Sequence, residues 1–290
     1  MKSVMRLAKV NFTKVTILGL LALALVSFTP WIHSGLEPDV TSSSGAVKWL
    51  PIHTTGHILG TEGQGRDMLA VLIVSIRNSL ILGSIAVLVS VVLGGTFGIL
   101  LGYILNRGPL ERILLFVARI VKSIPLLMWI FLLVFWTEVL SSIIPFLESE
   151  TVRMPWVFGL LGMIYSFNLA LFLRGHIKKL KASQFIEACE ALGLKKSTII
   201  FRHIIWHCSK DLFGNQASYI FVQCILLEIT LSFHAIGYGY SPNSLSLGSL
   251  FDRAVFERPM SQHMYMPLLA AFLLTLLFSI MAQRFGRRLG

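Results

Sequence analysis

The chain has 290 residues, of which 55% are hydrophobic and only 13% are charged, and its mean hydropathy is +0.75. A soluble globular domain carries about 25% charged residues, so this composition argues against a water-soluble fold and indicates a protein embedded in lipid. The net charge of +11 does not require a nucleic-acid partner, because membrane proteins concentrate lysine and arginine in the loops on one side of the bilayer.

Six apolar stretches follow one another along the chain, each close to the length of about 17–25 residues with which a helix crosses a bilayer. They are predicted at residues 15–32, 79–105, 114–140, 156–173, 213–231 and 264–282. The sequence therefore predicts an all-α membrane protein with about six transmembrane helices.

The first stretch follows a basic N-terminal segment and resembles a signal peptide, but no small-residue cleavage site follows Phe28. We interpret it as a retained anchor, with a cleaved signal as the alternative. The predicted organisation is a cytoplasmic N-terminus at 1–14, a first transmembrane helix at 15–32, a periplasmic loop at 33–78 and a five-helix core at 79–290.

The distribution of basic residues predicts the orientation of these helices. With the N-terminus inside, 19 of the 25 lysines and arginines fall in or beside segments on the inner side. The positive-inside rule therefore places both termini in the cytoplasm, and anionic lipid on the inner face reinforces this orientation.

The second apolar stretch carries a small residue at every fourth position. These residues are Ala86, Ser90, Gly94, Gly98 and Gly102. On a helix they form one groove, which a neighbouring backbone can approach closely. We interpret the groove as a helix-packing surface; the functional alternative is that it faces a partner subunit or a pore.

The longest loop on the predicted inner side, at about 178–210, is rich in helix-forming residues. Apolar residues recur at helical spacing as far as Leu192, and Gly193 is placed to end this helix in the left-handed conformation. A second helical run at 198–206 follows, with Ser197 as its candidate N-cap. Such a helix–glycine–helix element is suited to be gripped by another protein; an amphipathic hairpin on lipid headgroups is the alternative.

Three groups of residues in this order carry a family resemblance. The first group is Gly60-Thr61-Glu62-Gly63-Gln64-Gly65-Arg66-Asp67, followed by Arg77-Asn78-Ser79-Leu80. The second group is Phe185-Ile186-Glu187-Ala188-Cys189-Glu190-Ala191-Leu192-Gly193, followed by Phe201-Arg202-His203-Ile204. The third group is Glu228-Ile229-Thr230-Leu231-Ser232-Phe233. The second group resembles the EAA loop of bacterial ABC importer permeases, and the three together resemble the DppC/OppC type, which serves dipeptides, oligopeptides or nickel. The resemblance spans roughly residues 10–285.

The chain departs from the pattern of that family at several positions. Glu62 stands where an aspartate is usual, Trp206-His207 where Pro-Asn is usual, and Ser246-Leu247-Gly248 where Ser-Trp-Gly is usual. These departures leave the fold in place and leave the substrate open.

The resemblance implies a type I ABC importer permease of the bacterial inner (cytoplasmic) membrane, importing dipeptides or oligopeptides. Nickel or another small solute, and a branch linked to antimicrobial peptides, are the alternatives. Implied partners are a homologous second permease subunit, two cytoplasmic ATPase subunits and a periplasmic substrate-binding protein. The residues that couple to the ATPase would be Glu187, Ala188, Cys189, Gly193 and His203.

No catalytic or cofactor site is expected in this chain. The sequence holds no G-x-x-x-x-G-K-[ST] phosphate loop, so ATP and Mg²⁺ are expected on the partner ATPase subunits. His203, His207 and Asp211 recur at steps of four residues, as metal ligands on a helix do, but His203 already has a place in the coupling loop, and no metal site is predicted.

Polar residues inside the apolar stretches have two interpretations. A carboxylate at the centre of a span costs on the order of 2.5–3.5 kcal/mol, so Glu228 is predicted to be a satisfied residue near a helix end, or else part of an outer gate. Asn168, Gln216 and Gln223 either form interhelical hydrogen bonds or line a pore.

Two other classes of protein are weaker alternatives. A secondary transporter typically has internal repeats and charges near the membrane midplane, whereas here no repeated half is evident and only the fifth stretch holds a central carboxylate. A membrane-embedded enzyme would need a cluster of His, Asp or Glu within the spans, and none is evident in the sequence.

Overall fold

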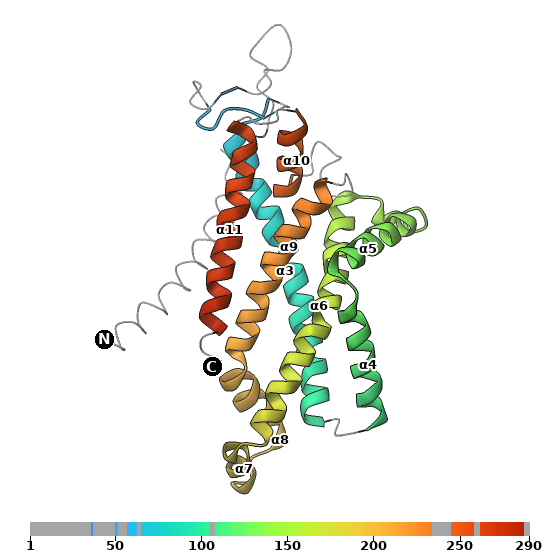
Figure 1. Cartoon of the computed structure of the whole chain (residues 1–290), viewed down its shortest axis with the longest axis vertical. Helices are drawn as coiled ribbons and strands as arrows, with labels where there is room; N and C mark the ends of the chain where they lie inside the picture. Colours follow the sequence, from blue (N-terminus) through green and yellow to red (C-terminus); the bar gives the residue numbers. More distant parts are fainter. Residues whose placement is uncertain are drawn as a thin grey trace, which may run out of the picture. The chain divides into compact units, whose positions relative to one another are not determined.

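The structure of the chain is a computed structural model (Figure 1). It describes Leu36 and residues 50–51, 57–62, 65–104, 108–233, 245–257 and 262–286. The predicted N-terminal segment 1–14 and the predicted first transmembrane helix 15–32 lie outside these residues, as does most of the predicted loop 33–78.

The named elements of the described part are all helical. The long helices are α3 (Met68–Ile99), α6 (Glu150–Lys181), α9 (Lys210–Phe233) and α11 (Gln262–Gly286). The shorter ones are η1 (Leu100–Ile104), α4 (Pro109–Ser123), α5 (Leu126–Ser141), η2 (Pro145–Leu147), α7 (Gln184–Ala191), α8 (Lys196–Thr198), η3 (Ile199–Cys208) and α10 (Leu247–Glu257). Within the described residues, four helices are long and apolar enough to cross a membrane, or five when the bent pair α4–α5 is taken as one span. The prediction of an all-α, multi-pass membrane protein is confirmed.

Two of the predicted spans are longer than the apolar stretches that indicated them. α3 begins at Met68 rather than at residue 79, because Asp67 caps its first turn: the amide of Ala70 donates to Asp67 Oδ2 at 3.2 Å. The polar pair Arg77-Asn78 hides this first part of the helix from a search for apolar residues. α6 likewise continues past the predicted stretch 156–173 at both ends.

The apolar stretch predicted at 114–140 is one bent pair of helices, not a single continuous helix. α4 and α5 meet at an angle of 94°, and Figure 1 shows the bend between them. Pro125 has no N–H to donate to the carbonyl of Val121, four residues earlier, so the helix cannot continue. The indole Nε1 of Trp129 donates to that carbonyl instead, at 3.0 Å, and satisfies it across the bend.

The helix α10 was not predicted, because its 11 residues are too few to cross a membrane. Leu247, Leu250 and Ala254 lie on one side of this helix and are buried. These residues are three, four and seven positions apart, which is the spacing of an amphipathic helix. This spacing was the signal in the sequence that could have indicated α10.

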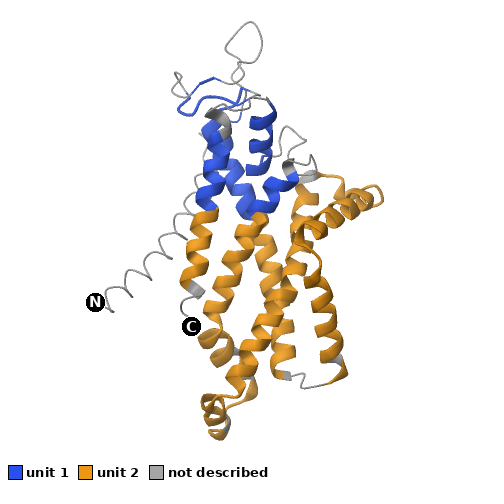
Figure 2. Cartoon of the chain, in the orientation of Figure 1, with its two compact units in different colours: residues 1–81, 225–274 blue, residues 82–224, 275–290 orange. Residues whose placement is uncertain are grey.

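The chain divides into two compact units, coloured separately in Figure 2. The first comprises Met1–Ile81 and Ile225–Leu274, and the second comprises Leu82–Cys224 and Thr275–Gly290. The core of the first unit contains Met68, Ala70, Val71, Val74, Leu245 and Leu250. The second unit contains a core cluster around α6, formed by Leu169, Leu173, Ile177, Ile186, Cys189, Ile199, Ile204 and Leu212.

Candidate functional site

The hairpin formed by α7, α8 and η3 contains the residues predicted to couple to an ATPase. Gly193 follows the end of α7 with φ 71°, which confirms the predicted left-handed turn. The amide of Leu194 donates to the carbonyl of Cys189 at 3.2 Å, the bond that closes a Schellman motif. A Cβ at Gly193 would meet no described atom within 4 Å, so the backbone conformation, and not a lack of space, favours glycine here.

The second arm of the hairpin differs in detail from its prediction. It begins with Lys195 as the N-cap of α8, not with Ser197, and continues as the π-helix η3. In a π-helix the hydrogen bonds join residues five apart, so residues four apart no longer stand above one another. His203 and His207 have ring centroids 6.1 Å apart, and among the described residues no group of three His, Cys, Asp or Glu side chains is placed to hold a metal ion.

One face of the hairpin is anchored to two transmembrane helices. Ile186 and Cys189 of α7 and Ile199 and Ile204 of η3 are buried in the core cluster of the second unit. The same cluster includes Leu173 and Ile177 near the end of α6, and Leu212 at the start of α9. The hairpin therefore shares one buried core with both helices.

The opposite face of the hairpin is exposed. Glu187 and Ala188 are both exposed, and the apolar side chains of Leu192 and Trp206 have 79% and 71% of their surface accessible. The ring of His203 lies edge-to-face with that of Phe185, with centroids 5.7 Å apart. Exposed apolar side chains beside charged ones are typical of a surface that a partner or lipid covers.

The groove of small residues, which runs along α3 and into η1, faces α6 of the same chain. A Cβ placed at Gly94, Gly98 or Gly102 would lie 2.8 to 2.9 Å from the nearest atoms of α6. Ala86 and Ser90 are fully buried, with 0% of their surface exposed. This geometry is that of helix packing within the chain.

Glu228 is 3% exposed and has hydrogen-bond partners inside the first unit. Its Oε1 lies 2.9 Å from the hydroxyl of Ser79, which donates to it, and 3.5 Å from the amide of Gly248. The amide of Leu247 donates to the Ser79 hydroxyl at 3.2 Å. Leu247 and Gly248 begin α10, and the free amides of a helix N-terminus favour a carboxylate.

This site brings together the first and third of the groups that carry the resemblance, through Ser79 and Glu228, with the segment 246–248, where the chain departs from the family pattern. Asn78 adds to it, because its Nδ2 donates to the carbonyl of Leu245 at 2.7 Å, just before α10. Leu247, which replaces a usual tryptophan, contributes to the polar site through its backbone amide. The departure at this position therefore leaves the hydrogen bond to Ser79 intact.

The segment before α3 contains a second buried polar cluster. Glu62 forms an ion pair with Arg66, and its other oxygen lies 3.9 Å from Nη1 of Arg253. Gly60 has φ 76°, and a Cβ there would collide with the carbonyl of Leu50. Glu62, which stands where the pattern that the sequence resembles has an aspartate, thus lies close to Arg253 of α10. Of the motif at residues 60–67, the structure describes residues 60–62 and 65–67 but not residues 63–64.

A charged cluster that involves the last turns of α6, before the hairpin, was not predicted. Glu111 of α4 is 4% exposed, and its Oε1 accepts hydrogen bonds from Nη2 of Arg174 at 2.7 Å and from Nζ of Lys178 at 2.8 Å. Both partners lie in the last turns of α6, directly before the hairpin. Only the folded chain brings Glu111 to residues more than sixty positions away, so no local spacing signals this contact.

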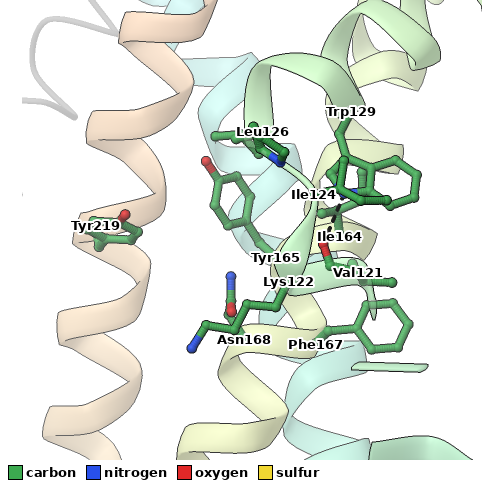
Figure 3. Close-up of a pocket in the computed structure, with 11 residues that line it drawn as sticks. Val121, Lys122, Ile124, Leu126, Trp129, Ile164, Tyr165, Phe167, Asn168 and Tyr219 are labelled. Carbon is green, nitrogen blue, oxygen red and sulfur yellow. Dashed lines mark hydrogen bonds between the residues drawn. The ribbon is translucent and has the colours of Figure 1, made fainter. Parts of the chain in front are cut away.

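A cavity with a mainly apolar lining lies beneath the bend between α4 and α5. It has a volume of about 290 Å³ and is lined in part by Lys122, Tyr165, Asn168 and Tyr219, which Figure 3 labels. A second cavity of about 330 Å³ shares these four residues and adds Gln216. Asn168 and Gln216, for which the sequence left two interpretations open, thus line open space in this structure.

Comparison with known proteins places these features in a family. The family described as "Binding-protein-dependent transport system inner membrane component" matches residues 94–290. The oligopeptide transport system permease protein OppC of Lactococcus lactis subsp. cremoris is 27% identical over 208 residues, which cover 72% of this chain and 65% of that protein. The match therefore spans less than two thirds of the length of that relative.

Two further relatives match over more of their length. OppC of Haemophilus influenzae is 27% identical over 256 residues, covering 87% of this chain and 75% of that protein. The glutathione transport system permease protein GsiD of Pectobacterium atrosepticum is 25% identical over 267 residues, covering 91% and 82%.

Among solved structures, a chain of the MetNI methionine ABC transporter in an inward-facing conformation superposes with a TM-score of 0.56 at 17% identity. The superposition covers 77% of this chain and 98% of that one. The two chains share a fold, which confirms the predicted fold class.

Proposed function

This chain belongs to the family of inner membrane components of binding-protein-dependent transport systems, and from this premise we propose that it forms half of the translocation pathway of an importer of dipeptides or oligopeptides. It is a non-catalytic, multi-pass membrane subunit. Its proposed partners are a homologous second permease subunit, two cytoplasmic ATPase subunits and a periplasmic substrate-binding protein.

The observation that carries the proposal is the anchored hairpin. A helix, a left-handed glycine and a second helix present Glu187 and Ala188 outward, while Ile186 and Cys189 are buried against α6 and α9. A surface helix that only rested on lipid would gain little from a core shared with two transmembrane helices. A helix that transmits a mechanical step needs such a core.

The mechanism follows from this division of roles. ATP and Mg²⁺ would be bound by the ATPase subunits, because this sequence has no phosphate-binding loop. Nucleotide binding draws the ATPase subunits together and displaces the hairpin. α6 and α9 then rock with it, and a two-state equilibrium shifts between inward- and outward-open forms.

The peptide substrate is supported by the names of the relatives, which are permeases for oligopeptides and for glutathione, itself a short peptide. The buried hydrogen bonds around Glu228 would hold the start of α10 to Ser79 and Glu228. Their proposed role is to keep α10 in place at an outer gate.

The test is co-purification and ATP-driven uptake by the reconstituted complex. The tagged chain should bring ATPase subunits with it, and a cysteine at Ala188 should form a crosslink to one of them. Ala188→Trp should abolish peptide uptake while the protein inserts at its normal level. Ala188→Ser, which adds a single oxygen, is the matched control and should transport normally.

Gly193→Val supplies an independent variant. Valine in the left-handed conformation costs on the order of 1–3 kcal/mol, so the second arm should shift and uncouple ATP hydrolysis from uptake. Gly193→Asn, which tolerates this conformation, should retain most of the uptake. If no ATPase subunit co-purifies and Ala188→Trp transports normally, the hairpin is a lipid-facing element and the proposal is wrong.

A further inference from the structure

The two arms of the hairpin carry opposite charge. α7, the first arm, holds Glu187 and Glu190 and no lysine or arginine. The second arm, residues 195–210, holds no aspartate or glutamate and has four exposed cations, which are Lys195, Lys196, Arg202 and Lys210. Because complementary charge favours association, the two arms fit two different partners.

The second arm also exposes a tryptophan. Trp206 has 71% of its surface accessible, whereas Ile204 and Ser209 of the same arm are buried. Trp206-His207 stands where the pattern that the sequence resembles has Pro-Asn. Tryptophan is enriched where a membrane meets water, because its ring is apolar and its N–H is polar. Together with exposed cations, such a side chain is typical of a surface that meets anionic headgroups.

The length of the next helix places Trp206 at the depth of the headgroups. The apolar span of α9, Lys210–Leu231, has 22 residues, which at 1.5 Å per residue is about 33 Å, close to the hydrocarbon core of about 30 Å. The headgroup layer adds roughly 5–8 Å on each side. Only Ser209 separates η3 from α9, so Trp206, one helical turn before Lys210, falls within this layer.

We propose that the second arm binds anionic phospholipid of the inner leaflet, the side on which the lysine and arginine distribution places the hairpin. The Trp206 ring lies among the headgroups, and Arg202 and Lys210 pair with their phosphates. This inference goes beyond the proposed function and depends on neither the cargo nor the ATPase subunits. It leaves α7, with its two glutamates, available to a partner protein.

The test is tryptophan fluorescence of the complete transporter in proteoliposomes that contain a brominated phospholipid, which quenches tryptophans it contacts. The part of the quenching that Trp206→Phe removes belongs to Trp206. At equal mole fraction, brominated phosphatidylglycerol should quench Trp206 at least about twofold more than brominated phosphatidylcholine, because each lysine or arginine near the surface attracts anionic lipid about fivefold. The difference should shrink at 1 M salt, where charges are screened beyond about 3 Å.

Charge variants separate attraction to anionic lipid from mere contact with the bilayer. Arg202→Gln combined with Lys210→Gln should make the two lipids quench Trp206 equally. Arg112→Gln combined with Arg119→Gln removes two exposed cations of α4 instead. This matched control should keep the difference of the parent.

Two results overturn the inference. One is equal quenching of Trp206 by the two lipids in the parent; the other is no quenching by either, because water or an ATPase subunit surrounds the ring. Both leave the proposed function standing, since no uptake is measured. If no ATPase subunit assembles with the chain, the proposed function fails, and the same measurement on the chain alone still decides the inference.

Discussion

At the residue scale, two carboxylates paired with arginine differ in how much water surrounds them. The side chain of Glu111 is 5% exposed and pairs with Arg174 and Lys178, whereas that of Glu138 is 63% exposed and pairs with Arg153 at 2.7 Å. Exposed ion pairs contribute little because water and salt screen them. The cations beside Glu111 are themselves partly exposed, which limits what its removal can cost.

We therefore expect Glu111→Gln to lower the free energy of unfolding by about 1–3 kcal/mol, because a nearly buried carboxylate loses charge-assisted hydrogen bonds to two cations. Glu138→Gln, the matched control, should change it by less than about 0.5 kcal/mol. Thermal unfolding of the purified protein in detergent measures both. Equal losses for the two variants would show that burial of Glu111 does not strengthen its ion pairs.

At the element scale, the contact between α3 and α6 depends on which side of α3 a glycine occupies. A Cβ at Gly94 would lie 2.8 Å from the carbonyl oxygen of Ser166, which is backbone and cannot rotate away. A Cβ at Gly95, the next residue, would lie 3.6 Å from the ring of Phe213, an ordinary contact distance. Of these two neighbouring glycines, Gly95 has room for a Cβ and Gly94 does not.

Gly94→Ala should lower the unfolding temperature and the amount of protein in the membrane, because α3 and α6 must move apart. Gly98→Leu should do so more strongly, since its first side-chain carbon would already lie 2.8 Å from Leu173. Gly95→Ala should be neutral or stabilising by up to about 1 kcal/mol, the difference in helix propensity. If Gly94→Ala and Gly98→Leu both kept the unfolding temperature and the membrane level of the parent, this groove would not be a packing surface.

The elements that the sequence predicted well are those whose signal is local. Apolar length indicated α6, α9 and α11, and Gly193 indicated the turn of the hairpin. The bend at Pro125 was missed because a hydropathy window averages over a single proline that ends the helix. α10 was missed because it is short, and its role depends on Ser79 and Glu228, which come from two distant helices.

The same reasoning explains what was missed at the candidate sites. Glu111 and Arg174 are far apart in sequence, and so are Lys122 and Tyr165. Polar residues in an apolar stretch do not reveal whether they meet each other or open space until the helices are packed. The sequence indicated Asn168 and Gln216 as polar positions, and the packing of α4, α6 and α9 decides what surrounds them.

At the scale of the whole molecule, the distribution of lysine and arginine predicts that the segment before α3 lies outside and that the hairpin lies inside. A cysteine at Ser43, which falls outside the described residues, should react with an impermeant thiol reagent in intact cells. One at Ala182, exposed at the end of α6, should react only after the membrane is opened. The background should lack the native cysteines, since Cys208 is only partly buried. If only the cysteine at Ala182 were labelled in intact cells, the orientation would be the opposite of the predicted one.

The bend at Pro125 decides how this part of the chain can cross a bilayer. α4 has 15 residues and α5 has 16, so at 1.5 Å per residue each is about 22–24 Å long, shorter than the hydrocarbon core of about 30 Å. Neither helix alone is long enough to cross that core, so a crossing at this point of the chain needs α4 and α5 together.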